Sequence, residues 1–228
     1  MAPPPPVAAS RRAELALRLG IGALLLIVAA SLFGAIAEDV VNGDRLTALD
    51  SEIALWLHRR TEVPLTRVMI VVTHLHSTLA IACYAAIAGV WFAWRRRWRE
   101  LATVVVTVGG GLVLNVLMKR VFQRARPTFD EPLLTLTSYS FPSGHVAAST
   151  IFYGLVVAWV LARTRRPLWR ALVVVGALAM IALVAFTRMY LGLHYLSDVA
   201  AAFAEGVAWL AICLSALAAY WHRTRVAS

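Results

Sequence analysis

The chain has 228 residues, of which 61% are hydrophobic and 15% charged, and its mean hydropathy is +0.74. This composition excludes an ordinary soluble globular domain and favours an integral membrane protein. The net charge of +10 does not indicate a nucleic-acid-binding protein, because the basic residues gather at the ends of apolar runs and do not cover one surface. We therefore expect the bilayer as a partner and no nucleic acid.

The N-terminal region has two parts. Residues 1–18 open with a proline-rich decapeptide and are expected to form a disordered cytoplasmic tail. The apolar run at 19–37 is long enough to be a first transmembrane helix. A cleaved signal peptide is the alternative, because Arg11 and Arg12 precede the run and Ala35-Ile36-Ala37 ends it. The run of about 19 residues exceeds a usual signal core, which favours a retained span.

Five further apolar runs predict an all-α membrane bundle of about six helices. The apolar stretch at 64–94 is too long for one span, so we divide it at residues 73–77 and expect an interfacial piece before the second span. His74 and His76 lie at this break and have no assigned role. The bundle is predicted to be a single domain over 19–222, followed by a cytoplasmic tail at 223–228. The five later spans are expected near 77–94, 101–118, 146–162, 168–187 and 195–220.

The distribution of arginine predicts the orientation of the bundle, because cytoplasmic loops carry an excess of basic residues. With the N-terminus in the cytoplasm, the inner segments contain only Glu14 and Glu100 as acidic residues. Their arginines are Arg11, Arg12, Arg18, Arg95, Arg96, Arg97, Arg99, Arg163, Arg165, Arg166, Arg170, Arg223 and Arg225. Tryptophans typical of a membrane boundary fall on the same side, namely Trp91, Trp94, Trp98, Trp159, Trp169 and Trp221. We therefore predict an N-in, C-in topology.

The two cysteines, Cys83 and Cys213, both fall inside apolar runs. They are interpreted as small buried hydrophobic residues and not as a disulfide pair or metal ligands.

A basic segment follows the third span, on the side where the charge rule predicts few positive residues. It runs Lys119-Arg120-Val121-Phe122-Gln123-Arg124-Ala125-Arg126-Pro127. Lys119 and Arg126 are about two helical turns apart and would share one face if the helix continued outward, whereas Arg120 and Arg124 would not. An ammonium and a planar guanidinium both suit phosphate oxygens. The alternative is a basic loop that contacts lipid headgroups.

Directly before the fourth span lies Ser140-Phe141-Pro142-Ser143-Gly144-His145. Ser143 and Gly144 at a helix start would present free backbone N–H groups, which bind anions. The alternative for Ser143 is a structural helix cap. His145, in the first turn of that helix, is placed to exchange a proton with a substrate.

The third polar segment joins the last two spans and contains Arg188, Gly192, His194 and Asp198. His194 and Asp198 are four residues apart, so on a helix the carboxylate would lie next to the imidazole. A carboxylate that holds one ring nitrogen frees the other to attack as a covalent nucleophile. The alternative is a structural His-Asp pair at a helix start.

Together the three segments resemble the signature of the type 2 phosphatidic acid phosphatase superfamily, which also includes the soluble vanadium haloperoxidases. The matching residues are Lys119-x6-Arg126-Pro127, Pro142-Ser143-Gly144-His145 and Arg188-x5-His194-x3-Asp198. Thr187 stands where the family usually has serine before the arginine, and it keeps the hydroxyl. The resemblance implies a six-helix membrane phosphatase that needs no metal or other cofactor, and no paired His or Cys cluster argues otherwise.

The resemblance also implies a role for each matching residue. His194, oriented by Asp198, would attack phosphorus, and His145 would protonate the leaving alkoxide and then activate water. The phosphate oxygens would be held by the remaining motif residues, namely Lys119, Arg126, Ser143, Gly144 and Arg188. Glu205, inside the last span, is interpreted as a helix-packing residue, with a proton path as the alternative.

We therefore expect a multi-pass plasma-membrane phosphatase whose site faces the outer side. Its expected partner is a phosphorylated lipid, either a polyprenyl diphosphate, phosphatidylglycerophosphate or phosphatidic acid. A phosphotransferase with the same histidine and a non-enzymatic lipid transporter or scaffold are the alternatives. A vanadate-dependent oxidase is disfavoured, because the family members with that activity are soluble.

Overall fold

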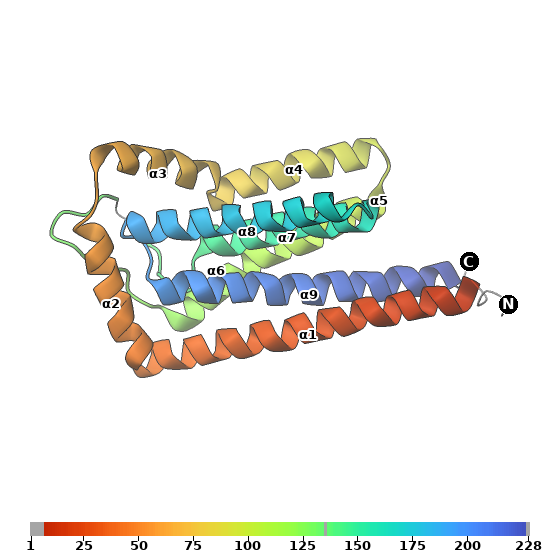
Figure 1. Cartoon of the computed structure of the whole chain (residues 1–228), viewed down its shortest axis with the longest axis horizontal. Helices are drawn as coiled ribbons and strands as arrows, with labels where there is room; N and C mark the ends of the chain where they lie inside the picture. Colours follow the sequence, from red (N-terminus) through yellow and green to blue (C-terminus); the bar gives the residue numbers. More distant parts are fainter. Residues whose placement is uncertain (1–6, 135, 227–228) are drawn as a thin grey trace.

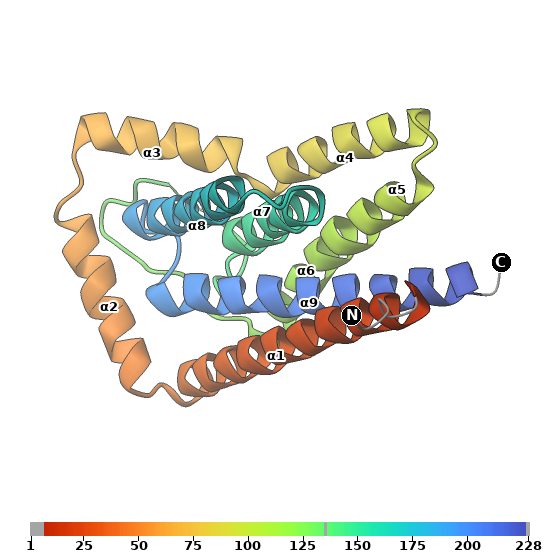
Figure 2. The same cartoon turned by 45° about the vertical axis from the view of Figure 1, so that its right-hand side comes forward.

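The computed structural model describes residues 7–134 and 136–226, and every regular element within them is a helix. The long helices run side by side, and both chain termini lie at one end of the bundle (Figure 1). At the opposite end, helix α2 (Arg45–His58) crosses the bundle and the long loop between α6 (Gly110–Phe122) and α7 (Gly144–Arg163) lies nearby (Figure 2). The predicted all-α architecture is confirmed.

Five helical segments are each long and apolar enough to cross a membrane, and a bent pair of helices forms a sixth candidate. The third span is continuous through a π-helical turn at Val105–Gly109. The single-helix spans are α1 (Val7–Asn42), α7, α8 (Pro167–Tyr190) and α9 (Leu196–Val226), and the composite one joins α5 (Trp98–Val104), the π-helical turn and α6. The prediction of about six spans is therefore confirmed.

The bent pair consists of α3 (Val63–Leu75) and α4 (Thr78–Trp94). The helix direction bends by 42° at the break between them. The Ser77 hydroxyl caps α4 by accepting a hydrogen bond from the Ala80 N–H at 3.1 Å. The break thus lies within the predicted division at 73–77. The piece before it is a helix, and its last turn carries Thr73, whose hydroxyl accepts a hydrogen bond from Arg188.

The N-terminal prediction needs a correction. Helix α1 begins at Val7, so residues 7–18 are helical and not a disordered tail, while residues 1–6 lie outside the described residues. The proline-rich composition stops at residue 6, and residues 7–18 are rich in helix-forming Ala, Leu and Arg, with an ion pair between Arg18 and Glu14 at 2.6 Å. Likewise α9 continues to Val226, so most of the predicted C-terminal tail is helical.

Helix α1 packs along α9 over much of its length (Figure 1). Near the end of the bundle opposite the termini, which carries the polar motifs and is called the polar end below, Ile36 and Ala37 of α1 form a buried cluster with Phe141 and with Ala201 of α9. Retention of the apolar run at 19–37, with a cleaved signal peptide as the alternative, stays a prediction.

Helices α7 and α9 approach each other closely. A Cβ atom on Gly206 of α9 would lie 2.7 Å from the Thr150 Cβ of α7, so only glycine permits this contact. Below the polar end, Val146 and Ala147 of α7 pack against Val199 and other residues of α9. The close packing sets the starts of the two helices side by side, and both starts carry polar motif residues.

The cysteine prediction is half wrong. Cys213 is buried, but Cys83 is exposed on α4. Leu79, Ile87 and Val90 of the same helix are exposed as well. In a membrane protein an apolar side chain can face lipid, so an apolar run does not identify which of its residues lie inside the protein.

Candidate active site

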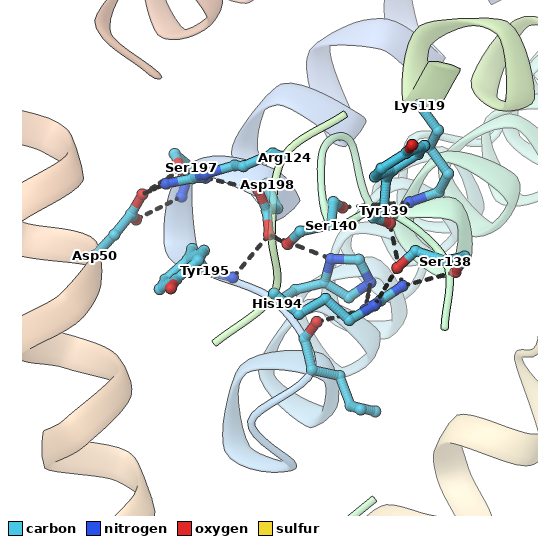
Figure 3. Close-up of polar contacts among 12 residues, drawn as sticks. Asp50, Lys119, Arg124, Ser138, Tyr139, Ser140, His194, Tyr195, Ser197 and Asp198 are labelled. Carbon is cyan, nitrogen blue, oxygen red and sulfur yellow. Dashed lines mark hydrogen bonds and ion pairs between the residues drawn. The ribbon is translucent and has the colours of Figure 1, made fainter. Parts of the chain in front are cut away.

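The three polar motifs meet at the end of the bundle opposite the chain termini (Figures 1 and 3). Helix α6 ends there at Phe122, α7 begins at Gly144, α8 ends at Tyr190 and α9 begins at Leu196. The ends of four helices thus bring together residues that are up to 79 positions apart in the chain, from Lys119 to Asp198.

His194 lies in the turn between α8 and α9, and not on a helix as its spacing from Asp198 suggested. Gly192 allows that turn with a φ of 69°. The His194 Nδ1 nevertheless lies 3.3 Å from Asp198 Oδ2, because Asp198 sits in the first turn of α9 and also accepts the Tyr195 N–H at 2.9 Å. The predicted pair therefore forms through a helix-start geometry.

The other ring nitrogen of His194 faces a cation. Its Nε2 lies 3.2 Å from Arg126 Nη1, and the residue is 2% exposed. Burial lowers the pKa of His194 to about 3, and the nearby Arg188 and Arg126 add to the effect, outweighing the opposite influence of Asp198. A neutral imidazole with its proton on Nδ1, toward the carboxylate, keeps a lone pair on Nε2.

Lys119 and Arg126 converge by a route that helical periodicity did not predict. Helix α6 ends at Phe122 because Gln123 adopts a left-handed conformation with a φ of 47°, so Arg126 belongs to a loop. Both cations instead donate to the Tyr139 carbonyl oxygen. Lys119 Nζ does so at 2.7 Å (Figure 3), and Arg126 Nη2 does so at 3.1 Å. The two side chains are neighbours because the loop before α7 folds back over the end of α6.

Ser143 and Gly144 begin α7 beside these cations. Ser143 occupies the N-cap position, but its buried hydroxyl makes no cap hydrogen bond and has no partner among the described residues, so the structural-cap interpretation is wrong. The Ser143 N–H donates to the Asp198 carbonyl oxygen at 3.1 Å and links α7 to α9. A Cβ on Gly144 would lie 3.8 Å from the Lys119 Cε and 3.1 Å from Asn115 Oδ1. A side chain at this position would therefore crowd Asn115 and contact Lys119, and glycine avoids this.

Arg188 lies in the last turn of α8 and is buried, at 2% exposed. Its Nη1 donates to Thr73 Oγ1 at 2.8 Å and lies 3.4 Å from His145 Nε2. Its Nε and Nη2 have no partner within the part of the chain that the structure describes. A buried cation without a carboxylate is costly, and a bound anion would compensate the cost. The two free nitrogens and the free Ser143 hydroxyl are therefore candidates for binding an anion.

Two residues of this region were missed or set aside in the sequence. Arg124, excluded because it would lie off the Lys119 face of a helix, donates to Asp198 Oδ1 at 2.7 Å and to Asp50 Oδ2 at 2.8 Å (Figure 3). The helix ends before Arg124, so the argument from helical faces does not apply. Asp50 lies on α2, far along the chain from the motifs, and no sequence signal marked it. Arg124, by contrast, lay inside the basic segment.

Within the described part of the chain, the site contains cations and histidines but no acidic cluster suited to a metal. Among residues 7–134 and 136–226, no group of three or more His, Cys, Asp or Glu side chains is placed to hold a metal ion. The positive charge that faces the His194 Nε2 belongs to protein side chains.

The family model of the PAP2 superfamily matches residues 100–223, which include all three motifs. The chain belongs to the PAP2 superfamily. This confirms the resemblance in the motifs and identifies the protein as a multi-pass membrane phosphatase, a hydrolase of phosphoric esters. The hydroxyl of Thr187, the departure from the usual motif, donates to the Val184 carbonyl oxygen within α8 at 2.7 Å.

Named relatives and solved structures agree with this membership. Phosphatidylglycerophosphatase B of Bacillus subtilis (strain 168) is 30% identical over 150 residues, which cover 63% of this chain and 70% of that protein. The crystal structure of a transmembrane PAP2 type phosphatidylglycerolphosphate phosphatase from Bacillus subtilis superposes with a TM-score of 0.69 and 26% identity, covering 85% and 94% of the two chains. The fold is also shared with Aquifex aeolicus LpxE, at a TM-score of 0.55, 20% identity and coverage of 73% and 94%.

Proposed function

We propose that this PAP2 phosphatase hydrolyses the phosphate of a membrane lipid through a phosphohistidine formed on His194. The observation that carries the proposal is the environment of the His194 ring, whose Nδ1 contacts Asp198 while its Nε2 faces Arg126. A nucleophilic nitrogen aimed at a group of cations suits attack on an anionic phosphorus centre.

The phosphoryl group would lie between the cations and the start of α7. Lys119, Arg126 and Arg188 would neutralise its oxygens, and the Ser143 hydroxyl and Gly144 N–H would complete the set of donors. Support comes from two Arg188 nitrogens and from Ser143 Oγ, which are buried and have no hydrogen-bond partner among the described residues. Donors that need no reorganisation stabilise a transition state most effectively.

The reaction would proceed in two displacements. In the first, His194 Nε2 bonds to phosphorus as the bond to the lipid oxygen breaks, and His145 supplies the proton that the departing alkoxide takes. In the second, His145 accepts a proton from water, the water oxygen bonds to phosphorus and the bond to His194 breaks. Inorganic phosphate leaves and both histidines return to their starting states.

The substrate is proposed to be a phosphatidyl-type phosphomonoester, with phosphatidylglycerophosphate as the first candidate. The motif-bearing helix ends lie at one end of the bundle, where a headgroup would sit, and exposed apolar side chains along the helices can contact acyl chains. The 30% identical relative is named for phosphatidylglycerophosphate. Phosphatidic acid and a polyprenyl diphosphate present similar phosphates on similar anchors.

We further propose that the site faces the outer side of the plasma membrane. The site lies at the end of the bundle opposite the termini, and the arginine-rich turns are expected to be cytoplasmic. Single cysteines test this in a Cys83→Ser, Cys213→Ser background. A membrane-impermeant maleimide added to intact cells should label Glu131→Cys in the site loop and spare Arg95→Cys, whereas the reverse pattern would place the site inside.

The decisive experiment compares substrates in mixed micelles with purified protein. Phosphate release should be fastest from a lipid phosphomonoester and much slower from glucose 6-phosphate, and His194→Ala should lack activity on all of them. Equal kcat/KM for the soluble sugar phosphate would refute the lipid assignment. Transfer of labelled phosphate to a second lipid, with little release to water, would show a phosphotransferase instead.

A further inference from the structure

A buried charge network lies behind the His194–Asp198 pair. The guanidinium of Arg124 lies between two carboxylates, donating to Asp198 Oδ1 at 2.7 Å and to Asp50 Oδ2 at 2.8 Å (Figure 3). Both carboxylate side chains are 0% exposed, and the Arg124 side chain is 12% exposed. Such a network is far more costly to disrupt than a surface ion pair, because removing one member leaves a buried charge unpaired.

Asp50 comes from a part of the chain that the family motifs do not cover. It lies on α2, the helix that crosses one end of the bundle (Figure 2). Asp50 is buried there, as are Ala54 and Leu57 of the same helix. Glu52, two residues on, is exposed. A carboxylate on the buried face of an otherwise ordinary amphipathic helix therefore needs a specific partner.

The partners of Asp50 are at the start of α9. Its Oδ1 accepts the Ser197 N–H at 2.9 Å, and its Oδ2 accepts the Ser197 hydroxyl as well as Arg124. The first N–H groups of a helix have no partner within it, and a negative charge there also interacts favourably with the helix dipole. Asp50, on α2, thus caps the start of α9. It does so at Ser197, the residue directly before Asp198.

We infer that Asp50 is a positioning residue for catalysis, which acts through Arg124 and Ser197 to hold the Asp198 carboxylate toward His194. This inference rests on the proposed role of His194 as the nucleophile. Asp198 Oδ1 is held by Arg124, while Oδ2 accepts the Ser140 hydroxyl and contacts His194. With Oδ1 anchored, the carboxylate cannot rotate Oδ2 away from the imidazole.

Asp50 also keeps the net charge beside His194 negative. Arg124 paired with Asp198 alone would cancel the charge that must stabilise His194 when phosphorylation makes its ring positive. Because Asp50 shares the same guanidinium, the three side chains carry a net negative charge next to His194. Loss of Asp50 should therefore slow formation of the phosphohistidine and leave the binding of phosphate to Lys119 and the other cations intact.

The test measures the two steps separately in purified, full-length protein. Asp50→Asn keeps the shape of the side chain and removes its charge, and Glu52→Gln is the matched control on the exposed face. We expect Asp50→Asn to slow acid-labile phosphoenzyme formation by about 10- to 100-fold, the range found when outer hydrogen bonds that orient metal ligands are removed. KM and inhibition by inorganic phosphate should stay within about twofold, and Glu52→Gln should match wild type.

Two further variants guard against misfolding and test whether the network acts as a unit. Ser197→Ala keeps every charge and removes only the hydroxyl between Asp50 and Arg124, so it should fold normally and slow phosphoenzyme formation severalfold. Asp50→Asn combined with Arg124→Gln should be no slower than the slower single variant, since members of one unit are not additive.

The outcomes separate the two proposals. A folded Asp50→Asn protein that forms phosphoenzyme at the wild-type rate, or that loses phosphate affinity as much as rate, overturns the role of Asp50 alone. A wild-type rate in Ser197→Ala does the same for the link through Ser197. Absence of any acid-labile phosphoenzyme in the wild-type protein overturns the nucleophile assignment on which the inference rests.

Discussion

The two ends of the bundle use arginine in opposite ways. At the end with the termini, Arg95 and Arg96 lie in an exposed turn beside exposed Trp94 and Trp98. At the other end, Arg124 and Arg188 are largely or fully buried, and each donates hydrogen bonds to specific oxygen atoms, Arg124 to Asp198 Oδ1 and Arg188 to Thr73 Oγ1. At the first end the number of charges is expected to set the topology, whereas at the second end the position of each charge is expected to matter.

The sharpest contrast between the two ends should come from His194→Ala. Removing the nucleophile should lower kcat/KM for a lipid phosphate by about 10⁴-fold or more, the scale seen when a catalytic triad loses a member. Rapid quenching with labelled substrate should trap an acid-labile phosphoenzyme in wild type only. Arg95→Gln, at the opposite end, is the control and should keep wild-type kcat/KM. Robust activity in His194→Ala protein would remove this residue from the mechanism.

The next largest effect should come from the cations. Lys119→Ala, Arg126→Ala and Arg188→Ala should each lower kcat/KM by about 10²- to 10³-fold, the cost of losing one preorganised oxyanion donor. Vanadate should inhibit the wild-type enzyme as a phosphate mimic and inhibit these variants more weakly. Arg163→Ala at the other end of the bundle is the control.

If the cation variants and Arg163→Ala have the same kcat/KM, the proposed difference between the two ends of the bundle is wrong. The basic segment would then be a surface for lipid headgroups and not part of a phosphate site.

A smaller effect, on stability and not on chemistry, is expected from Gly206→Ala. The new Cβ would lie 2.7 Å from the Thr150 Cβ, so α7 and α9 must separate, at a cost of about 1–3 kcal/mol. A lower thermal unfolding midpoint in detergent would reveal it. Gly34→Ala is the matched control, because nothing lies within 4 Å of its Cβ position. Equal midpoints for the two variants would mean that the contact between α7 and α9 is softer than the structure indicates.

The smallest effect is expected from Glu205→Gln. Glu205 is buried in α9 and accepts a hydrogen bond from Asn115 Nδ2 at 2.8 Å, as a helix-packing residue would. Glutamine keeps the shape and the acceptor, so kcat should change by less than about threefold and the change in stability should stay below about 1 kcal/mol. A large fall in kcat at unchanged thermal stability would instead favour a proton path through this residue.

Much of the molecule is determined by local sequence alone. The apolar runs predict the spans because the thickness of a bilayer demands a minimum length of apolar helix. The three motifs identify the family and nominate residues that the structure brings to one place, His194 and Arg188 among them. These inferences hold because each depends on residue types at short, fixed spacings along the chain.

Tertiary structure decided what local spacing could not. Arg126 reaches the site from a loop and not a helical face, because α6 ends at Phe122. The Ser143 hydroxyl has no partner among the described residues although its position suits a cap, and Cys83 faces outward although its surroundings in sequence are apolar. Asp50 carries no motif at all. Its pairing with Arg124 depends on how α2 crosses the bundle, and such long-range packing is encoded by many distant contacts together and not by any short pattern.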